Sequence, residues 1–296
     1  MVTFTRAART PAFFAMHEPV VRRLLIDLHT PPARHWCGGD AFRTAWFNAL
    51  SMSFPSGEQF FIDSVRAGVL QLPEEQKARF EPAIKAFIGQ EATHRRIHAL
   101  FNAHLAAQGL INHWEARAMR RIQVFEGKDV RGAVGATAAT EHLTAIMAEH
   151  LLSDPWTLQD AEPRFVTMWL WHASEETEHR ATAFDVYRAL GGNEKWRLRL
   201  FRIITMHFLI DALRQTANNL WHDGTLWRAS TWVSGWRFLF GRRGLLRTLA
   251  GPWRRYNHAD FHPSQQDESR AIAWLRDHAA QFDRVGSPAA TVGAPA

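Results

Sequence analysis

Hydrophobic residues recur along this chain at helical spacing, and no segment of useful length alternates apolar and polar residues as a half-buried strand would. The stretch 83–91 reads Ala-Ile-Lys-Ala-Phe-Ile-Gly-Gln-Glu, and its larger apolar residues fall at positions 84, 87 and 88. Those positions share one face of a helix. We therefore expect an all-α fold.

Proline, glycine and acidic residues mark the expected helix ends. Pro73, followed by Glu74 and Glu75, favours a helix start, because proline fits the first turn and acidic side chains complement the helix dipole. Gly109 and Gly191 are typical helix stops. We expect long helices over residues 41–70, 73–108, 130–152 and 163–190, with a shorter connecting helix over 112–125.

Pro55 falls inside the first of these helices, three residues before Glu58. A proline in a helix interior removes a backbone hydrogen bond and costs about 3 kcal/mol in a plain helix. We expect the break to open backbone or space beside Glu58.

The predicted helices divide the chain into four parts. Residues 1–39 form an N-terminal arm, whose amphipathic stretch 20–28 is ended by two prolines. Residues 40–192 form a four-helix bundle, and residues 193–285 form a helical appendage packed on it. The last part, 286–296, is small and contains proline and glycine, so we expect it to be disordered.

One pattern of glutamate and histidine occurs twice on the predicted long helices. In each copy a single Glu is followed 33 or 35 residues later by Glu-x-x-His. Residues three apart share a helix face, so each Glu-x-x-His pair can offer one carboxylate and one imidazole to a metal ion. The two copies comprise Glu58, Glu91, His94, Glu141, Glu176 and His179.

The spacing within each copy fits an antiparallel helical hairpin that brings the single Glu opposite the Glu-x-x-His pair. Two facing hairpins would surround one cavity with four carboxylates and two imidazoles. Burying ionised carboxylates costs several kcal/mol unless a metal or partner compensates. The pattern therefore predicts a site for two metal ions in a ferritin-like bundle, the ligand arrangement of di-iron and di-manganese proteins.

Four further residues fall on or near the same helix faces. His98 and His172 each lie one turn from a predicted ligand, and we expect them to be additional ligands or partners that orient a ligand. Glu149 should face the cavity rim or pair with an arginine. Asp185 lies near the face of Glu176 and is placed to accept a hydrogen bond from a ligating imidazole.

Two neighbours of the predicted ligands point elsewhere. Glu175 is rotated by about 100° from Glu176, so we expect it to form a salt bridge and to be dispensable for metal binding. His142 is likewise rotated from Glu141, and at most supports a ligand.

The predicted ligand set contains oxygen and nitrogen donors and no thiolate. Such a set suits iron or manganese better than structural zinc, and of the two we expect iron before manganese. Two such ions can activate dioxygen, or they can polarise an ester or phosphate beside a bound hydroxide. We favour an oxidase or oxygenase by analogy with the fold. A metal-dependent hydrolase and a storage or non-catalytic metal protein remain alternatives.

The composition limits the class of protein. The chain has 296 residues, 46% hydrophobic and 22% charged, which indicates a globular protein with a full core. Its single cysteine, Cys37, excludes an internal disulfide and fits a cytoplasmic location. The N-terminus predicts no secretory signal, and the apolar stretch 200–213 is too interrupted by polar residues to cross a membrane.

The segment 196–256 differs in composition from the rest of the chain. It carries eleven arginines against two aspartates, a local surplus of nine positive charges that exceeds the +6 of the whole chain, and it contains six tryptophans. We expect a helical cover on the bundle, with peripheral contact to an anionic membrane as the functional alternative. The expected substrate is small or lipid-like, no motif indicates nucleic acid, and the sequence leaves the oligomeric state open.

Around the motifs the sequence resembles a known bacterial family. The segments 54–61, Phe-Pro-Ser-Gly-Glu-Gln-Phe-Phe, 91–98, Glu-Ala-Thr-His-Arg-Arg-Ile-His, and 171–187, which contains Glu176 and His179, are similar to the family named "predicted metal-dependent hydrolase", a relative of the ferritin-like group. The resemblance covers roughly residues 40–265. It implies a bound metal, and its label implies hydrolysis.

Overall fold

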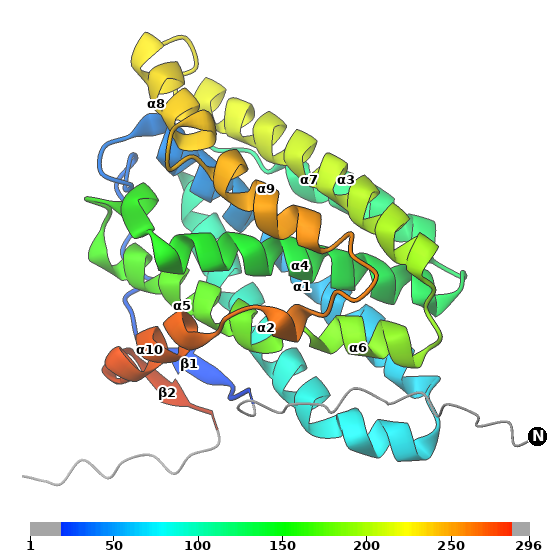
Figure 1. The fold of residues 1–296 in the computed structure, drawn as a ribbon. Helices are drawn as coiled ribbons and strands as arrows, with labels where there is room; N and C mark the ends of the chain where they lie inside the picture. The colour runs from blue at the N-terminus through cyan, green and yellow to red at the C-terminus, as the bar shows by residue number, and fades with distance from the viewer. Residues whose placement is uncertain (1–18, 286–296) are drawn as a thin grey trace, which may run out of the picture.

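The computed structural model describes residues 19–285, and within them the prediction of an all-α fold is confirmed (Figure 1). The predicted disordered tail 286–296 and the first eighteen residues of the arm lie outside the described residues. The longer helices are α1 (Ala41–Leu70), α2 (Glu74–Ala107), α4 (Val130–Ser153), α5 (Pro163–His179) and α7 (Glu194–His222). The shorter ones are α3 (His113–Ile122), α6 (Thr182–Ala189), α8 (Ala229–Phe240), α9 (Leu245–Arg255) and α10 (Ser269–Asp277).

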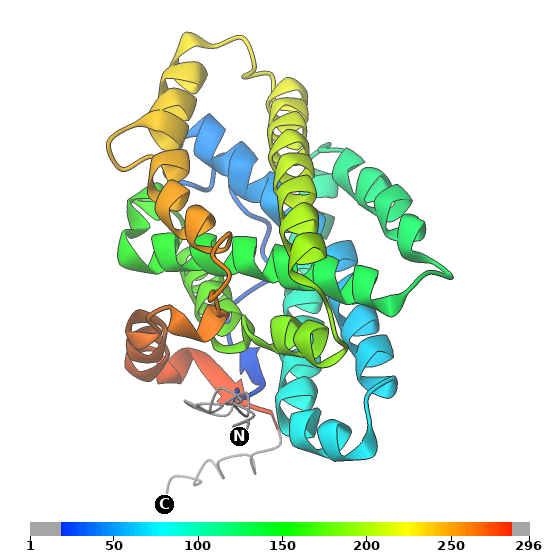
Figure 2. The same cartoon turned by 45° about the vertical axis from the view of Figure 1, so that its right-hand side comes forward.

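Four helices enclose the centre of the molecule. Helix α1 packs along α2, α4 packs along α5, and α1 also contacts α4. Helix α7 lies across α1 and α4, as Figures 1 and 2 show, and α9 covers part of α4. The predicted helical appendage therefore contacts α1, α4 and α5, while its separation as a domain and the relation to the ferritin-like group remain predictions.

The fourth predicted helix, 163–190, is wrong as one continuous element. Helix α5 ends at His179, and α6 begins at Thr182. At the break, the buried guanidinium of Arg180 donates hydrogen bonds to the carbonyl oxygens of Pro263 (3.0 Å) and Gln266 (2.6 Å). These contacts with the C-terminal segment accompany the change of direction just after the last predicted ligand, and they could not be read from local helix propensity.

Two short strands also depart from the predicted absence of β-structure. Strand β1 (Arg22–Leu24) pairs antiparallel with β2 (Phe282–Arg284), with Leu24 opposite Phe282. Three residues per strand are too few to produce a recognisable alternation in sequence. The pairing joins the N-terminal arm to the C-terminal end of the described chain beside α5 and α10 (Figure 1).

Helix α1 continues through Pro55, and the missing backbone bond is replaced by a side chain. Pro55 has no N–H to offer the carbonyl of Ser51, one turn earlier. The side-chain amide of Asn102 on α2 donates to that carbonyl at 2.9 Å. The proline thus frees a backbone acceptor at Ser51, and α2 satisfies it without a break in α1.

We expect Asn102→Ala to lower the free energy of unfolding by about 1–3 kcal/mol, because the Ser51 carbonyl loses its partner. Urea denaturation measures the loss. In a Pro55→Ala background the restored N–H can bond the same carbonyl, so Asn102→Ala should cost less there. Equal losses in both backgrounds would contradict the assignment.

Candidate metal centre

The six predicted ligands come from the four central helices and meet in the interior. Glu58 lies on α1, Glu91 and His94 on α2, Glu141 on α4, and Glu176 and His179 on α5. All six side chains are buried, and none is more than 5% exposed. Such a concentration of buried carboxylates needs compensating positive charge.

Both Glu-x-x-His pairs converge on one group. Glu91, His94, Glu176 and His179 each offer one donor atom, and these atoms lie within 4.8 Å of one another. Glu176 Oε1 lies 3.6 Å from His94 Nδ1 and 3.8 Å from His179 Nε2. His179 Nε2 is also 3.7 Å from Glu91 Oε1. These separations leave room for a cation that each atom could reach at about 2.0–2.2 Å.

A second group adjoins the first. Glu58, His98 and His172 offer donor atoms within 4.8 Å of one another, so both additional histidines from the sequence reach the cluster. His172 Nε2 lies 3.9 Å from Glu58 Oε1 and donates a hydrogen bond to Glu176 Oε1 at 2.9 Å. Glu176 Oε1 therefore lies between the two groups.

This division differs from the expectation that each Glu-x-x-His pair would serve its own ion. Among residues 19–285 the two pairs share one group, and the second position is formed with histidines one turn away. Glu141 belongs to neither group, because His179 Nδ1 donates to Glu141 Oε2 at 3.0 Å. In this arrangement Glu141 orients His179, and its other oxygen stays free.

Unpaired polar atoms concentrate at the same place. Buried carboxylate oxygens and imidazole nitrogens without a hydrogen-bond partner are costly, and native proteins contain few of them. Here they belong to both oxygens of Glu58 and Glu91, one oxygen of Glu141 and of Glu176, His94 Nδ1 and His179 Nε2. The donor set and its missing partners fit a bound cation.

The charge state of the carboxylates points the same way. Burial, together with repulsion from neighbouring glutamates, raises the pKa of Glu58 and of Glu91 well above the ordinary value. Burial also penalises the charge on Glu176, but its hydrogen bond with His172 and the charge of His179 outweigh that penalty and lower its pKa. Without metal, protons held by Glu58 and Glu91 therefore neutralise the negative charge that bound cations would otherwise neutralise.

The imidazoles divide into neutral and charged members. Burial, and then the neighbouring His172, hold the pKa of His94 and of His98 well below the ordinary value. Burial opposes charge on His179 as well, but its partner Glu141 more than offsets this and raises the pKa of His179 to about 9. Neutral imidazoles are the form that binds metal, so His94 is ready to ligate.

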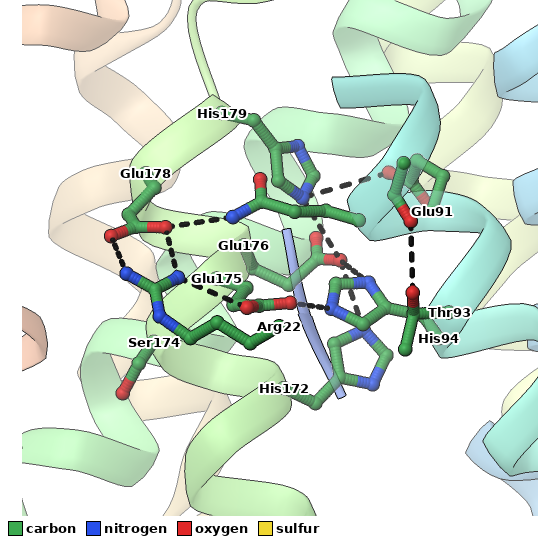
Figure 3. A network of polar contacts seen from close by, with 12 residues as sticks. Arg22, Glu91, Thr93, His94, His172, Ser174, Glu175, Glu176, Glu178 and His179 are labelled. Carbon is green, nitrogen blue, oxygen red and sulfur yellow. Dashed lines mark hydrogen bonds and ion pairs between the residues drawn. The ribbon is translucent and has the colours of Figure 1, made fainter. Parts of the chain in front are cut away.

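A chain of charged residues orients His94 from outside the cluster (Figure 3). His94 Nε2 donates to Glu175 Oε2 at 2.9 Å, leaving Nδ1 to face Glu176. Arg22 donates to Glu175 at 3.0 Å and to both oxygens of Glu178 at 2.7 and 2.9 Å. Burial raises the pKa of Glu175 to about 8 against the opposing charge of Arg22.

The salt bridge predicted for Glu175 is therefore confirmed, and its contact with His94 leads us to expect that Glu175 also matters for metal binding. A carboxylate that holds the far nitrogen of a ligating imidazole typically contributes 10- to 100-fold to metal affinity. Arg22 was missed, because its partners lie more than 150 residues away. The only sequence signal was its place in the amphipathic stretch of the arm.

We expect Glu175→Gln to weaken metal affinity by about tenfold or more while keeping most of the fold. The amide preserves the shape but removes the carboxylate that His94 contacts. Competition with a chromophoric chelator measures the affinity. Glu149→Gln, a change outside both groups, serves as the control, and equal affinities of the two variants would contradict this role.

A second chain of polar contacts continues from His172 into α1. His98 Nε2 lies 2.7 Å from His172 Nδ1, and His98 Nδ1 lies 2.8 Å from Ser51 Oγ. Ser51 is the residue whose carbonyl Pro55 leaves free. The residue whose carbonyl is freed by Pro55 therefore also supports His98, and His98 fixes the ring orientation of His172.

Two of the four additional residues have other partners. Glu149 forms an ion pair with Arg270, the alternative foreseen for it. Asp185 accepts a hydrogen bond from His262 Nε2 at 2.8 Å, so the expectation that it would hold a ligating imidazole is wrong. His262 lies in the C-terminal segment, a contact that the spacing on α5 and α6 could not reveal.

His142 does not support a ligand either. Its ring packs among Phe201, Tyr256 and Phe261, with ring centroids 4.6–5.4 Å apart. Burial in this aromatic layer lowers the pKa of His142 to about 3. It is a packing residue between α4 and the C-terminal segment.

Two cavities reach the cluster from different sides. One, of about 60 Å³, has apolar walls that include Phe47, Trp169 and Phe238, and it is bordered by His172 and Glu176. The other, of about 140 Å³, runs between α1, α3, α4 and α7 and reaches Glu58, with Arg121, His207 and Asp211 among its lining residues. The cluster is therefore buried but adjoins space for small molecules.

The pKa shifts predict how pH acts on the metal-free protein. Glu58, Glu91, Glu175 and His179 all have a higher pKa folded than unfolded, so the folded state holds extra protons above the ordinary pKa of each group. Between about pH 7 and pH 9 the effect comes from Glu175, with a pKa of about 8, and His179, with a pKa of about 9. The stability of the metal-free protein should fall by about 2 kcal/mol or more between about pH 7 and pH 9. The lowered pKa values of His94 and His98 act in the opposite direction only below the ordinary histidine range.

Urea unfolding of chelator-treated protein at several pH values measures this dependence. Metal replaces the protons, so the loaded protein should show a much flatter dependence. Glu91→Gln removes one raised carboxyl group and should make the metal-free protein more stable at the alkaline end while weakening metal binding. A metal-free protein whose stability rises over this range would contradict the charge assignment.

Comparison with known proteins agrees with the donor set. The family described as predicted metal-dependent hydrolase matches residues 20–267, and the chain belongs to that family. The expected resemblance is thereby confirmed over slightly more of the chain than predicted. Searches of curated proteins and of solved structures found no match. Within residues 19–285, every helix falls short of the length or apolar character that a membrane crossing requires.

Proposed function

We propose that the chain is an enzyme that binds two metal ions, iron or manganese, in the buried cluster and uses them to oxidise an apolar substrate with dioxygen. The observation that carries the proposal is Glu176, a buried carboxylate within 4 Å of three imidazoles and between two donor groups. Bridging carboxylates with histidines suit redox-active ions. Two such ions, with an external electron donor, would supply dioxygen activation.

The chain's own residues define the rest of the site. Glu91, His94, Glu176 and His179 would hold one ion, and Glu58 with His172 would hold the other. Glu175 and Glu141 fix the ring orientations of His94 and His179 through their second nitrogens. The apolar cavity at His172 would exclude water and receive an apolar group, while the cavity at Glu58 has polar residues for proton exchange.

Hydrolysis is the second candidate, and the family description favours it. The same ligands would hold Lewis-acidic ions that activate water, and no oxygen or electron donor would be needed. The apolar wall of the smaller cavity favours oxidation, since it offers an ester or phosphate few hydrogen-bond donors. Both candidates are enzymes that depend on metal.

Oxygen and metal dependence separate the two reactions. The reduced, iron-loaded protein should consume dioxygen faster than free ferrous iron under the same conditions, and zinc loading should abolish the uptake because zinc has no redox chemistry. Glu91→Ala serves as the control for metal held at the site. Hydrolysis of an activated ester by the zinc- or manganese-loaded protein without oxygen, and no oxygen uptake with iron, would overturn the oxidase proposal.

A further inference from the structure

Helix α8 presents an unusually apolar outer face. Four of its side chains, Trp232, Val233, Trp236 and Phe240, are about half exposed or more, and Trp227 just before it is 82% exposed. Trp232, Trp236 and Phe240 are spaced four residues apart, so they lie along one face of the helix. Trp236 and Phe240 also pack on each other, with ring centroids 4.6 Å apart. Helix α8 stands at one end of the molecule (Figures 1 and 2).

Helices α8 and α9 pack as a hairpin, and the charged residues of this hairpin are all positive. Residues 224–250 contain five arginines and neither aspartate nor glutamate. All five arginines are exposed, and among them Arg243 pairs with Asp154, which directly follows α4. They are Arg228, Arg237, Arg242, Arg243 and Arg247. We refer to these arginines and the five exposed apolar residues as the α8 surface.

A second copy of the chain and a membrane are the two partners to compare for such a surface, and the charge of the α8 surface favours one of them. In a symmetric pair of chains each α8 surface would face its own copy, and five arginines would approach five arginines. A membrane rich in anionic lipid offers phosphates to the arginines and an interface in which tryptophan is favoured. The combination of exposed aromatic rings and a surplus of arginine therefore fits an anionic lipid surface.

The inner side of the same hairpin closes the apolar cavity of the metal centre. Phe238 on α8 and Leu245 at the start of α9 are buried, and both line that cavity, which borders His172 and Glu176. Gly235 allows the close approach, because a Cβ there would lie 2.6 Å from the ring of Phe42 on α1. One hairpin thus separates the surface from the cavity.

We propose that the α8 surface docks on anionic lipid membranes and that the cavity beneath it admits the alkyl chain of a membrane-derived substrate. The docking stands on the α8 surface alone, whereas the use of the cavity rests on the proposed function. Docking would place the hairpin that closes the apolar cavity directly against the lipid. The substrate class is then a molecule with an alkyl chain that partitions into membranes.

Cosedimentation of the full chain with vesicles tests the docking. Vesicles of phosphatidylglycerol and phosphatidylcholine should bind the protein, vesicles of phosphatidylcholine alone should not, and added salt should weaken the binding. The double variant Trp236→Ser/Phe240→Ser should lose about tenfold or more in affinity for the anionic vesicles. Trp196→Ser/Met206→Ser on α7 removes two similarly exposed apolar residues and should bind like the original protein.

Negligible or equal binding to both kinds of vesicle would overturn the proposal, and so would an equal loss in the α7 variant. Sedimentation velocity without lipid tests whether a second copy of the chain binds the α8 surface instead. A dimer that the α8 double variant abolishes would replace the membrane by a second copy of the chain. Metal content is measured on the same samples, so failure to bind vesicles with normal metal content leaves the proposed function standing.

The alkyl-chain part has its own variant. Ala173→Phe on α5 places a ring in the cavity beside Glu176, and it should reduce binding of a spin-labelled fatty acid while vesicle binding persists. Ala173→Ser changes the same position without adding a ring to the cavity, and it serves as the control. Equal fatty-acid binding by Ala173→Phe and the original protein would overturn the cavity assignment without touching the docking.

Discussion

Replacing Glu176 with alanine is expected to lower bound metal from about two ions per chain to about one or fewer. Glu176 lies 2.9 Å from His172, 3.6 Å from His94 and 3.8 Å from His179, so its loss affects both donor groups. Glu91→Ala and His179→Ala should behave similarly. Inductively coupled plasma mass spectrometry on purified, reloaded protein gives the metal content directly.

Glu149→Ala is the matched control for the Glu176 variant. It removes a glutamate from α4 that pairs with Arg270 and belongs to neither donor group, so it should keep the full metal content. A loss of less than half an ion in Glu176→Ala would contradict its place as a bridge. Circular dichroism of each variant separates loss of metal from loss of fold.

The second large effect is expected at Arg22. Its guanidinium is buried and pairs with Glu175, which is fully buried, and with Glu178. Arg22→Ala removes the cation from both carboxyl groups, which keep His94 and Gln90 as partners, and breaking a buried pair in this way costs about 3–5 kcal/mol. We expect that loss in the free energy of unfolding, measured in urea, together with weaker metal binding through Glu175 and His94.

The neighbouring Arg23 supplies the control. It pairs with Asp283 at an exposed site, where both side chains are more than half accessible, so Arg23→Ala should change the stability by about 0.5 kcal/mol or less. Adding Glu178→Gln to Arg22→Ala should recover part of the loss, because the carboxylate left without its cation is removed. Similar losses for Arg22→Ala and Arg23→Ala would contradict the role of Arg22.

The sequence predicted the helices α1, α2 and α4 and the burial of the glutamates and histidines, because both depend on spacing within single helices. Glu58, Glu91, His94, Glu176 and His179 converge, since residues three apart share a face whatever the rest of the chain does. Their grouping could not be predicted, because it depends on which atom of each ring or carboxylate faces inward. As a result, Glu141 contacts Nδ1 of His179 and belongs to neither group, whereas His98 and His172 form the second group with Glu58.

Contacts between distant segments account for the other differences. Arg22 lies on β1 and reaches α5 from the strand pair that β1 forms with β2. Arg180, at the break between α5 and α6, donates to carbonyl oxygens more than 80 residues later in the chain. Neither contact leaves a periodic signal in the sequence. Asp185 illustrates the same point, because its partner His262 comes from the C-terminal segment and not from the cluster.

The most direct test of the two-metal centre is anomalous diffraction from crystals of the iron-loaded protein, recorded above and below the iron edge. The account predicts two anomalous peaks, one among Glu91, His94, Glu176 and His179, and one beside Glu58 and His172. A protein that retains iron but shows a single peak, or peaks away from these side chains, would contradict it.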